Sequence, residues 1–246
     1  MGRVIRSELY RVKHTWIPWI HIVLPMFYAL VFFLASRLTG LKNFAPDDTI
    51  QAYFALFGAA VPSLCGVLTS KVVDMESGAG SFQALLATIP SRTKAYLGKE
   101  AALLLGFLLS ASVAVVLFGC LFGQRGAGFW GAALFFLLCG VPAVYCMHLW
   151  VALALGSGPS IGLGFVETLI AFLAMTGLGD KFWYFLPCTW PARLPGTYIV
   201  GSAWQDPSLL TGELAKWSFA ALPITAMVVF GSLVWFRRWD GKTWSD

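Results

Sequence analysis

Charged side chains are scarce in this chain of 246 residues, because Asp, Glu, Lys and Arg together make up only 12% of it. Hydrophobic residues make up 58%, and the mean hydropathy is +0.74. Soluble domains average roughly 45–50% apolar residues even when glycine is counted. A soluble core of this size cannot bury so much apolar surface. The composition therefore excludes an ordinary soluble enzyme, a disordered tail, a collagen and a disulfide-rich secreted module.

Motifs that bind cofactors or metals are also missing. The sequence contains no G-x-x-x-x-G-K-[ST] P-loop, no H-E-x-x-H zinc motif and no C-x-x-C pair. Four of the five cysteines lie in apolar stretches, where cysteine acts as a small apolar residue. The five are Cys65, Cys120, Cys139, Cys146 and Cys188. We therefore expect no cofactor, metal or catalytic residue on this chain.

Six apolar stretches are long enough to cross a membrane. A spanning helix needs about 20 mostly apolar residues, because the hydrocarbon layer is roughly 30 Å thick. The stretches lack the polar face of a soluble helix and the alternation of a barrel strand. The sequence thus predicts an all-α integral membrane protein with a single transmembrane domain over residues 1–246. The predicted spans are residues 16–36, 50–70, 101–123, 129–155, 161–179 and 217–236.

Lysine and arginine are distributed unequally between the two ends of these spans. If the N-terminus is cytoplasmic, 11 basic residues lie on the cytoplasmic side and 6 lie outside. The positive-inside rule therefore places both termini in the cytosol. The same bias explains the net charge of +5, and no basic and aromatic pattern indicates binding to nucleic acid.

Residues 1–15 are predicted to form a basic amphipathic helix. Ile5, Leu9 and Val12 recur at helical spacing between basic residues. Such an elbow helix lies in the headgroup layer and contacts membrane lipids. An alternative is that it also contacts a cytoplasmic partner.

Residues 75–92 form a second amphipathic element, after span two. The apolar positions of this element share one helix face, and they are Phe82, Leu85, Leu86 and Ile89. Ser81 is a suitable N-cap and Pro90 a stop, while Glu76 precedes the helix and Arg92 follows it. A short helix held between two spans can act as a lever that couples them to a partner. The alternative is a surface helix that only covers the bilayer edge.

Residues 180–216 differ from the rest because aromatic residues and prolines are concentrated there. They include Trp183, Tyr184, Phe185, Pro187, Trp190, Pro191, Pro195, Tyr198, Trp204 and Pro207. The segment is too interrupted by proline to span, and such aromatic residues favour the membrane interface. We expect an extracellular aromatic hairpin or re-entrant piece. It serves either as a belt that fixes helix tilt or as a lid for an amphipathic ligand, with Asp180, Trp183, Tyr184 and Trp190 as candidate contacts.

Glu167 is the one acid well inside a predicted span. A carboxylate at mid-bilayer costs about 2.5–3.5 kcal/mol on insertion scales, so Glu167 must face protein or water. It either lines a polar substrate pathway or makes a hydrogen bond between helices. His21 and His148 lie nearer to span ends, where a histidine with satisfied hydrogen bonds is the simpler interpretation.

Two groups of residues resemble a known family. Six spans with both termini inside, and a degenerate element after span two, resemble the permease subunits of ABC-2-type exporters; that element comprises Glu76, Leu85, Leu86, Pro90, Ser91, Arg92 and Lys99. The stretch around span five is similar to the lantibiotic-immunity permeases of the MutG group. It contains Gly162-Leu-Gly164, Thr176-Gly-Leu-Gly-Asp180, Trp183-Tyr-Phe-Leu-Pro187 and Trp190.

This resemblance implies a multi-pass permease subunit in the bacterial cell membrane. A separate ATP-binding cassette subunit would hold ATP and Mg²⁺, and a second, non-identical permease would complete the complex. The complex would expel a cationic amphipathic lantibiotic peptide and so give immunity. The alternatives are a permease for another lipophilic drug or peptide such as bacitracin, an intramembrane enzyme using Glu167, His148 or Cys146, and a peptide-binding scaffold that does not transport.

Overall fold

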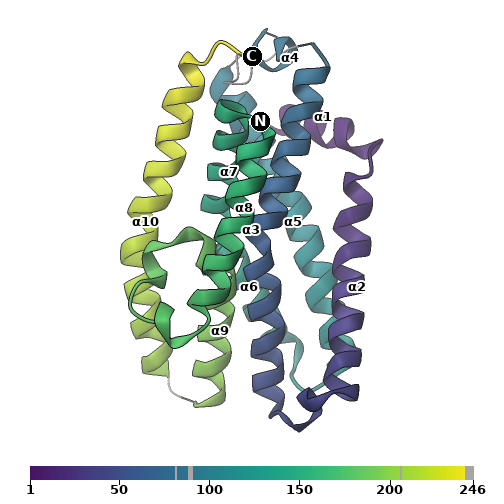
Figure 1. Ribbon diagram of the computed structural model, residues 1–246, viewed down its shortest axis with the longest axis vertical. Coiled ribbons are helices and arrows are strands. Elements are labelled where there is room, and N and C mark those ends of the chain that lie inside the picture. The colour runs from purple at the N-terminus through teal and green to yellow at the C-terminus, as the bar shows by residue number, and fades with distance from the viewer. Residues whose placement is uncertain (81, 88–90, 206, 242–246) are drawn as a thin grey trace.

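The computed structural model describes residues 1–80, 82–87, 91–205 and 207–241, and this part of the chain is an all-helical bundle (Figure 1). Six helical segments within it are long and apolar enough to cross a membrane. They are α2 (Ile17–Leu38), α3 (Pro46–Gly78), α5 (Arg92–Phe122), α6 with α7 (Ala127–Leu155), α8 (Ser157–Ala174) and α10 (Pro207–Arg238). The prediction of six spans in an all-α membrane protein is therefore confirmed.

The observed helices differ from the predicted spans mainly at their ends. The second and third are longer, because α3 continues to Gly78 and α5 begins at Arg92. The fifth is shorter, because α8 ends at Ala174 and a 3₁₀ turn, η2 (Gly177–Gly179), follows it. The last begins at Pro207, so part of the predicted aromatic segment belongs to α10.

The fourth span is two helices, α6 (Ala127–Cys139) and α7 (Pro142–Leu155). Pro142 begins α7, since proline has no N–H to continue the hydrogen bonds of α6. A Cβ on Gly140 would lie 2.7 Å from the backbone of Trp190 and Pro191. The break therefore admits the start of α9 (Trp190–Ala203) into the bundle.

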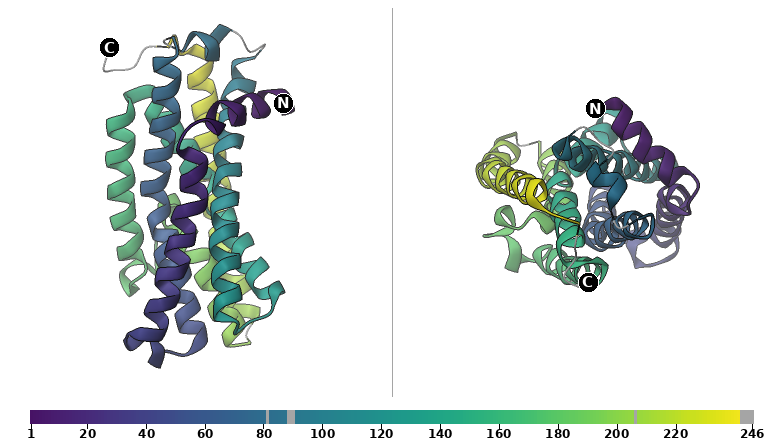
Figure 2. Two further views of the ribbon diagram at one scale, coloured as in Figure 1. Left: turned by 90° about the vertical axis from the view of Figure 1, so that its right-hand side faces the viewer. Right: turned by 90° about the horizontal axis from the view of Figure 1, so that it is seen from above.

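The short elements lie at the two ends of the bundle. At one end, which we call the proximal end, α1 (Gly2–Lys13) runs across the bundle axis (Figure 2). The same end holds α4 (Gln83–Ala87) and the end of α10 (Figure 1). At the opposite, distal end lie η1 (Gly40–Asn43), the end of α9 and the start of α10. The assignment of the proximal end to the cytosol stays a prediction.

The central helix is α3, which packs against α7, α8 and α9, while α2 packs against α5. Glycines allow the close approaches: a Cβ on Gly58 would lie 2.3 Å from the carbonyl oxygen of Pro191, and a Cβ on Gly164 would lie 2.6 Å from that of Pro62. Small residues at such contacts are typical of membrane helices, because packing rather than hydrophobicity holds the helices together in lipid.

The contact of α8 with α3 can be tested by a pair of substitutions on α8. We expect Gly164→Ala to destabilise the protein by about 1–3 kcal/mol, because the new methyl group overlaps the backbone of α3. Gly162, two residues earlier, has open space around its Cβ position. Gly162→Ala should therefore be neutral or stabilising by up to about 1 kcal/mol. Thermal unfolding in detergent measures the stability of both variants. If the two substitutions change the stability equally, the close contact of α8 with α3 at Gly164 is refuted.

Candidate functional site

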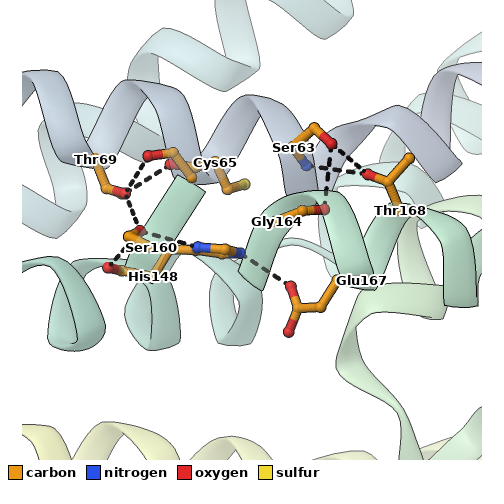
Figure 3. A network of polar contacts seen from close by, with 9 residues as sticks. Ser63, Cys65, Thr69, His148, Ser160, Gly164, Glu167 and Thr168 are labelled. Atoms are coloured by element: carbon orange, nitrogen blue, oxygen red, sulfur yellow. Dashed lines mark hydrogen bonds and ion pairs between the residues drawn. The ribbon is translucent and has the colours of Figure 1, made fainter. Parts of the chain in front are cut away.

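A polar network inside the membrane joins three helices (Figure 3). His148 on α7 lies with its Nε2 2.9 Å from Oε2 of Glu167 on α8, and its Nδ1 is 3.2 Å from Oγ of Ser160. The Ser160 hydroxyl is in turn 3.3 Å from Oγ1 of Thr69 on α3. All four side chains are buried. The network therefore ties α7 and α8 to the central helix.

A second set of polar contacts lies farther along the same helix pair. The hydroxyls of Ser63 on α3 and Thr168 on α8 are 2.7 Å apart, and Ser63 also donates a hydrogen bond to the carbonyl of Gly164. Glu167 stands between these two sets of contacts, and it is only 6% exposed. Its carboxylate makes a hydrogen bond between α8 and α7, and a role of Glu167 in a substrate pathway stays a prediction.

The three groups considered for an intramembrane enzyme do not converge. Cys146 lies with its Sγ 3.3 Å from the hydroxyl of Ser232 on α10, and it also contacts Tyr96 on α5. His148 and Glu167 face each other between α7 and α8 instead. The Cys146 thiol thus contacts α5 and α10, whereas the His148 imidazole contacts α8.

A cluster of charges is buried at the proximal end, and we call it the proximal ion cluster. Lys99 on α5 is 1% exposed, and its Nζ lies 2.7 Å from Oε2 of Glu8 and 3.0 Å from Oε1 of Glu76. Arg11 on α1 forms a second ion pair with Glu76. Two acids and two cations therefore connect α1, α3 and α5. Glu76, predicted as a coupling residue, is at the centre of this contact.

The predicted coupling helix is shorter than expected, since α4 comprises only Gln83–Ala87. Phe82 and Leu85 are buried, and the Phe82 ring lies 4.9 Å from the Trp239 ring beyond the end of α10. Arg92 donates hydrogen bonds to the carbonyls of Arg237 and Trp239. Leu86 is half-buried against the core.

The apolar face of this element thus packs against its own chain. The role of Phe82 and Leu85 in coupling to a partner stays a prediction. Gln83 of α4 is exposed. Ile89, the predicted N-cap Ser81 and the predicted stop Pro90 lie outside the described residues.

The aromatic segment folds back beside the distal half of α10 (Figure 1). Trp183 and Tyr184, in the 3₁₀ turn η3 (Trp183–Phe185), pack with Trp190 against Ala220 and Ala221. Trp190 donates a hydrogen bond from Nε1 to the Tyr184 carbonyl, at 3.0 Å. The three rings are buried and fill the bundle, so they are not an exposed lid surface.

The polar residues of this segment are nearer to the surface. Asp180 is exposed, and its carboxylate accepts a hydrogen bond from Nη2 of Arg193 at 2.8 Å. Tyr184 donates its hydroxyl to Glu213 on α10. Phe182 and Phe185 are exposed rings close to Asp180 in the sequence, and Trp204 is an exposed ring at the end of α9.

The sequence alone did not predict that Lys99 is buried or that Glu8 is its partner. The available signal was that Glu8 is the only acid before Asp47 and stands alone on a basic helix. Glu100, next to Lys99, was also left outside the predicted span. Both of its carboxylate oxygens are buried without a hydrogen-bond partner in the described part of the chain. No group of His, Cys, Asp and Glu that could hold a metal occurs in that part either.

Comparison with known proteins gives one match. Residues 4–171, about two thirds of the chain, match the model of a family described as ABC-2 family transporter protein. No curated protein and no solved structure is similar enough to count as a match. The matched residues include most of α1, the proximal ion cluster, the first four spans and most of the fifth.

Removal of the cation at the centre of the proximal ion cluster should strongly destabilise the fold. Lys99→Met removes the 2.7 Å ion pair of buried Glu8 and leaves it only Arg11 at 3.9 Å, and breaking a buried pair costs about 3–5 kcal/mol. Lys94 is exposed on the same helix, so Lys94→Met should change stability by less than about 0.5 kcal/mol. Thermal unfolding in detergent compares the two.

A second variant separates charge from packing. Adding Glu8→Gln to Lys99→Met removes the weakly paired carboxylate, so part of the lost stability should return. If Lys99→Met and Lys94→Met are equally stable, the cluster does not hold α1 to the bundle.

Proposed function

This chain belongs to the ABC-2 family of transporter proteins, and on that premise we propose that it is the permease subunit of an exporter driven by a separate ATP-binding cassette subunit. The match over residues 4–171 is the observation that carries the proposal. The chain itself has no P-loop motif. ATP and Mg²⁺ would therefore be bound by the partner, and this chain would convert the partner's motion into movement of its six spans.

The proximal end is the proposed contact for the ATP-binding subunit. It is predicted to face the cytosol, where ATP is available, and it carries the exposed residues Gln83 and Lys94. The proximal ion cluster supports this role. Lys99 bridges Glu8 of α1 and Glu76 of α3, so a force applied to either helix is transmitted to α5.

The proposed substrate is a cationic amphipathic peptide of the lantibiotic type, expelled to give immunity. The support is the resemblance of the sequence around span five to permeases of the MutG group. The exposed rings Phe182, Phe185 and Trp204 suit the apolar part of such a peptide, and Asp180, which pairs with Arg193, is an exposed acid that a cationic group of the peptide would contact. Other lipophilic peptides, such as bacitracin, are the alternative for the same site.

A second, non-identical permease is the proposed partner within the membrane. Three exposed side chains follow one face of α10, namely Phe219, Leu222 and Phe230. Spacings of three and eleven residues bring them to nearly the same side of the helix. This stripe can pack against another subunit or against lipid.

The function is tested in a peptide-sensitive bacterium that expresses this chain with its ATP-binding subunit and second permease. We expect resistance to the lantibiotic, because ATP hydrolysis drives expulsion. A hydrolysis-deficient ATP-binding subunit should reduce resistance to the level of cells without the transporter. Resistance that persists with that subunit would indicate a scaffold that binds the peptide. Resistance to bacitracin without resistance to the lantibiotic would identify bacitracin as the substrate.

The contact with the ATP-binding subunit is tested by adding a bulky side chain at each end of the bundle. Gln83→Trp places a large ring on the exposed side of α4. We expect it to weaken binding of the ATP-binding subunit at least about tenfold, which corresponds to about 1.4 kcal/mol of binding free energy, so less of that subunit should co-purify. Asn43→Trp, on the exposed distal turn η1, is the matched control and should leave co-purification unchanged. Equal recovery with both variants would exclude α4 from the contact.

A further inference from the structure

A cleft of about 430 Å³ lies beneath α1, between α2 and α5. Its size is within the range of small-molecule sites, roughly 300–1,000 Å³. In Figure 2, α1 crosses the proximal end of the bundle from the top of α2 toward α5. The cleft is therefore at the depth where an interfacial helix meets the outermost part of the acyl chains.

The mouth of the cleft carries uncompensated positive charge. Arg6 and Lys13 line it from α1, and seven residues of spacing place them on one helix face. Both are exposed, and neither makes an ion pair within the described part of the chain. Lys99 also lines the cleft, but Glu8 and Glu76 neutralise it.

The rest of the cleft is almost entirely apolar. Ala102, Leu103, Leu105 and Leu109 of α5 form one wall, and Leu105 and Leu109 are exposed on the side that faces the bilayer. The opposite wall comes from the start of α2, including Ile17. The site thus has a cationic mouth and an apolar body that opens laterally.

One residue of the cleft lining also lines a second cavity. His21 lines the cleft and also lines a cavity of about 230 Å³ between α2, α3 and α5. The lining of this cavity along α2 extends to Tyr28.

We propose that an anionic phospholipid occupies this cleft, with its phosphate at Arg6 and Lys13 and one acyl chain along Leu103 and Leu109. A free phosphate would leave the apolar walls unused. A neutral lipid would leave the two cations without a partner, and a cationic peptide would be repelled by them. Each lysine or arginine near an anionic headgroup contributes about fivefold in affinity.

The proposal is tested by native mass spectrometry of the full chain released from detergent, with dioleoyl phosphatidylglycerol or dioleoyl phosphatidylcholine added. We expect phosphatidylglycerol to bind and phosphatidylcholine to bind much more weakly. The variant Arg6→Gln with Lys13→Gln should bind phosphatidylglycerol about 25-fold more weakly. Equal binding of the two lipids by the wild type would overturn the role of the cations.

Two further variants locate the lipid. Arg3→Gln with Lys94→Gln removes the same charge from exposed proximal residues outside the cleft, so binding should change by less than about twofold. Ala102→Phe keeps both cations and fills the cleft from its half-buried wall, so binding should be lost. Two results would place the lipid on the general surface and refute the site. One is that the Arg3 and Lys94 control binds phosphatidylglycerol as weakly as the Arg6 and Lys13 variant. The other is that the Ala102→Phe variant binds it as well as the wild type.

Discussion

Hydrocarbon cannot solvate charge, and this constraint decides where the few charged residues of the protein lie. Lys99 is held at the proximal end because Glu8 and Glu76 both contact its ammonium group. Burial of one ion without a partner costs several kcal/mol, and two carboxylates with two cations avoid that cost. The position of α1 follows from this pairing, since Glu8 and Arg11 are both on that helix. A helix with a basic surface is thereby fixed to the bundle through its single acid.

The same constraint acts deeper in the membrane, where polar side chains on neighbouring helices pair with one another. Hydrogen bonds between membrane helices contribute modestly, about 0.6 kcal/mol on average, so several are needed to fix one helix pair. The contacts of α3 with α8 meet this need through hydroxyls, the His148 and Glu167 pair, and glycines that bring the backbones together. Glu167 is therefore best understood as part of the structure that positions α8.

Local patterns in the sequence identified the spans but not their ends. The count of six rested on apolar length, which the bilayer thickness dictates. The predicted ends stopped at charges, such as Lys71 and Glu100, whereas the helices continue through them. Those charges are acceptable inside helices because partners distant in the sequence neutralise some of them, as Glu8 does for Lys99. The apolar face of Phe82 and Leu85 was also identified, but its partner near Trp239 lies more than 150 residues away and leaves no local signal.

The two faces of α1 connect the structural and functional proposals. One face contributes Glu8 to the contact with Lys99, and the other contributes Arg6 and Lys13 to the mouth of the cleft. On α5, Leu103 lines the cleft one turn after Lys99. A displacement of α1 by an ATP-binding subunit would therefore move Arg6 and Lys13 relative to the apolar walls of the cleft, and it would disturb the ion pair of Glu8 with Lys99 at the same time. A lipid bound in the cleft would oppose the same displacement of α1 that the proximal ion cluster opposes. The membrane composition and the partner subunit would therefore both act on α1.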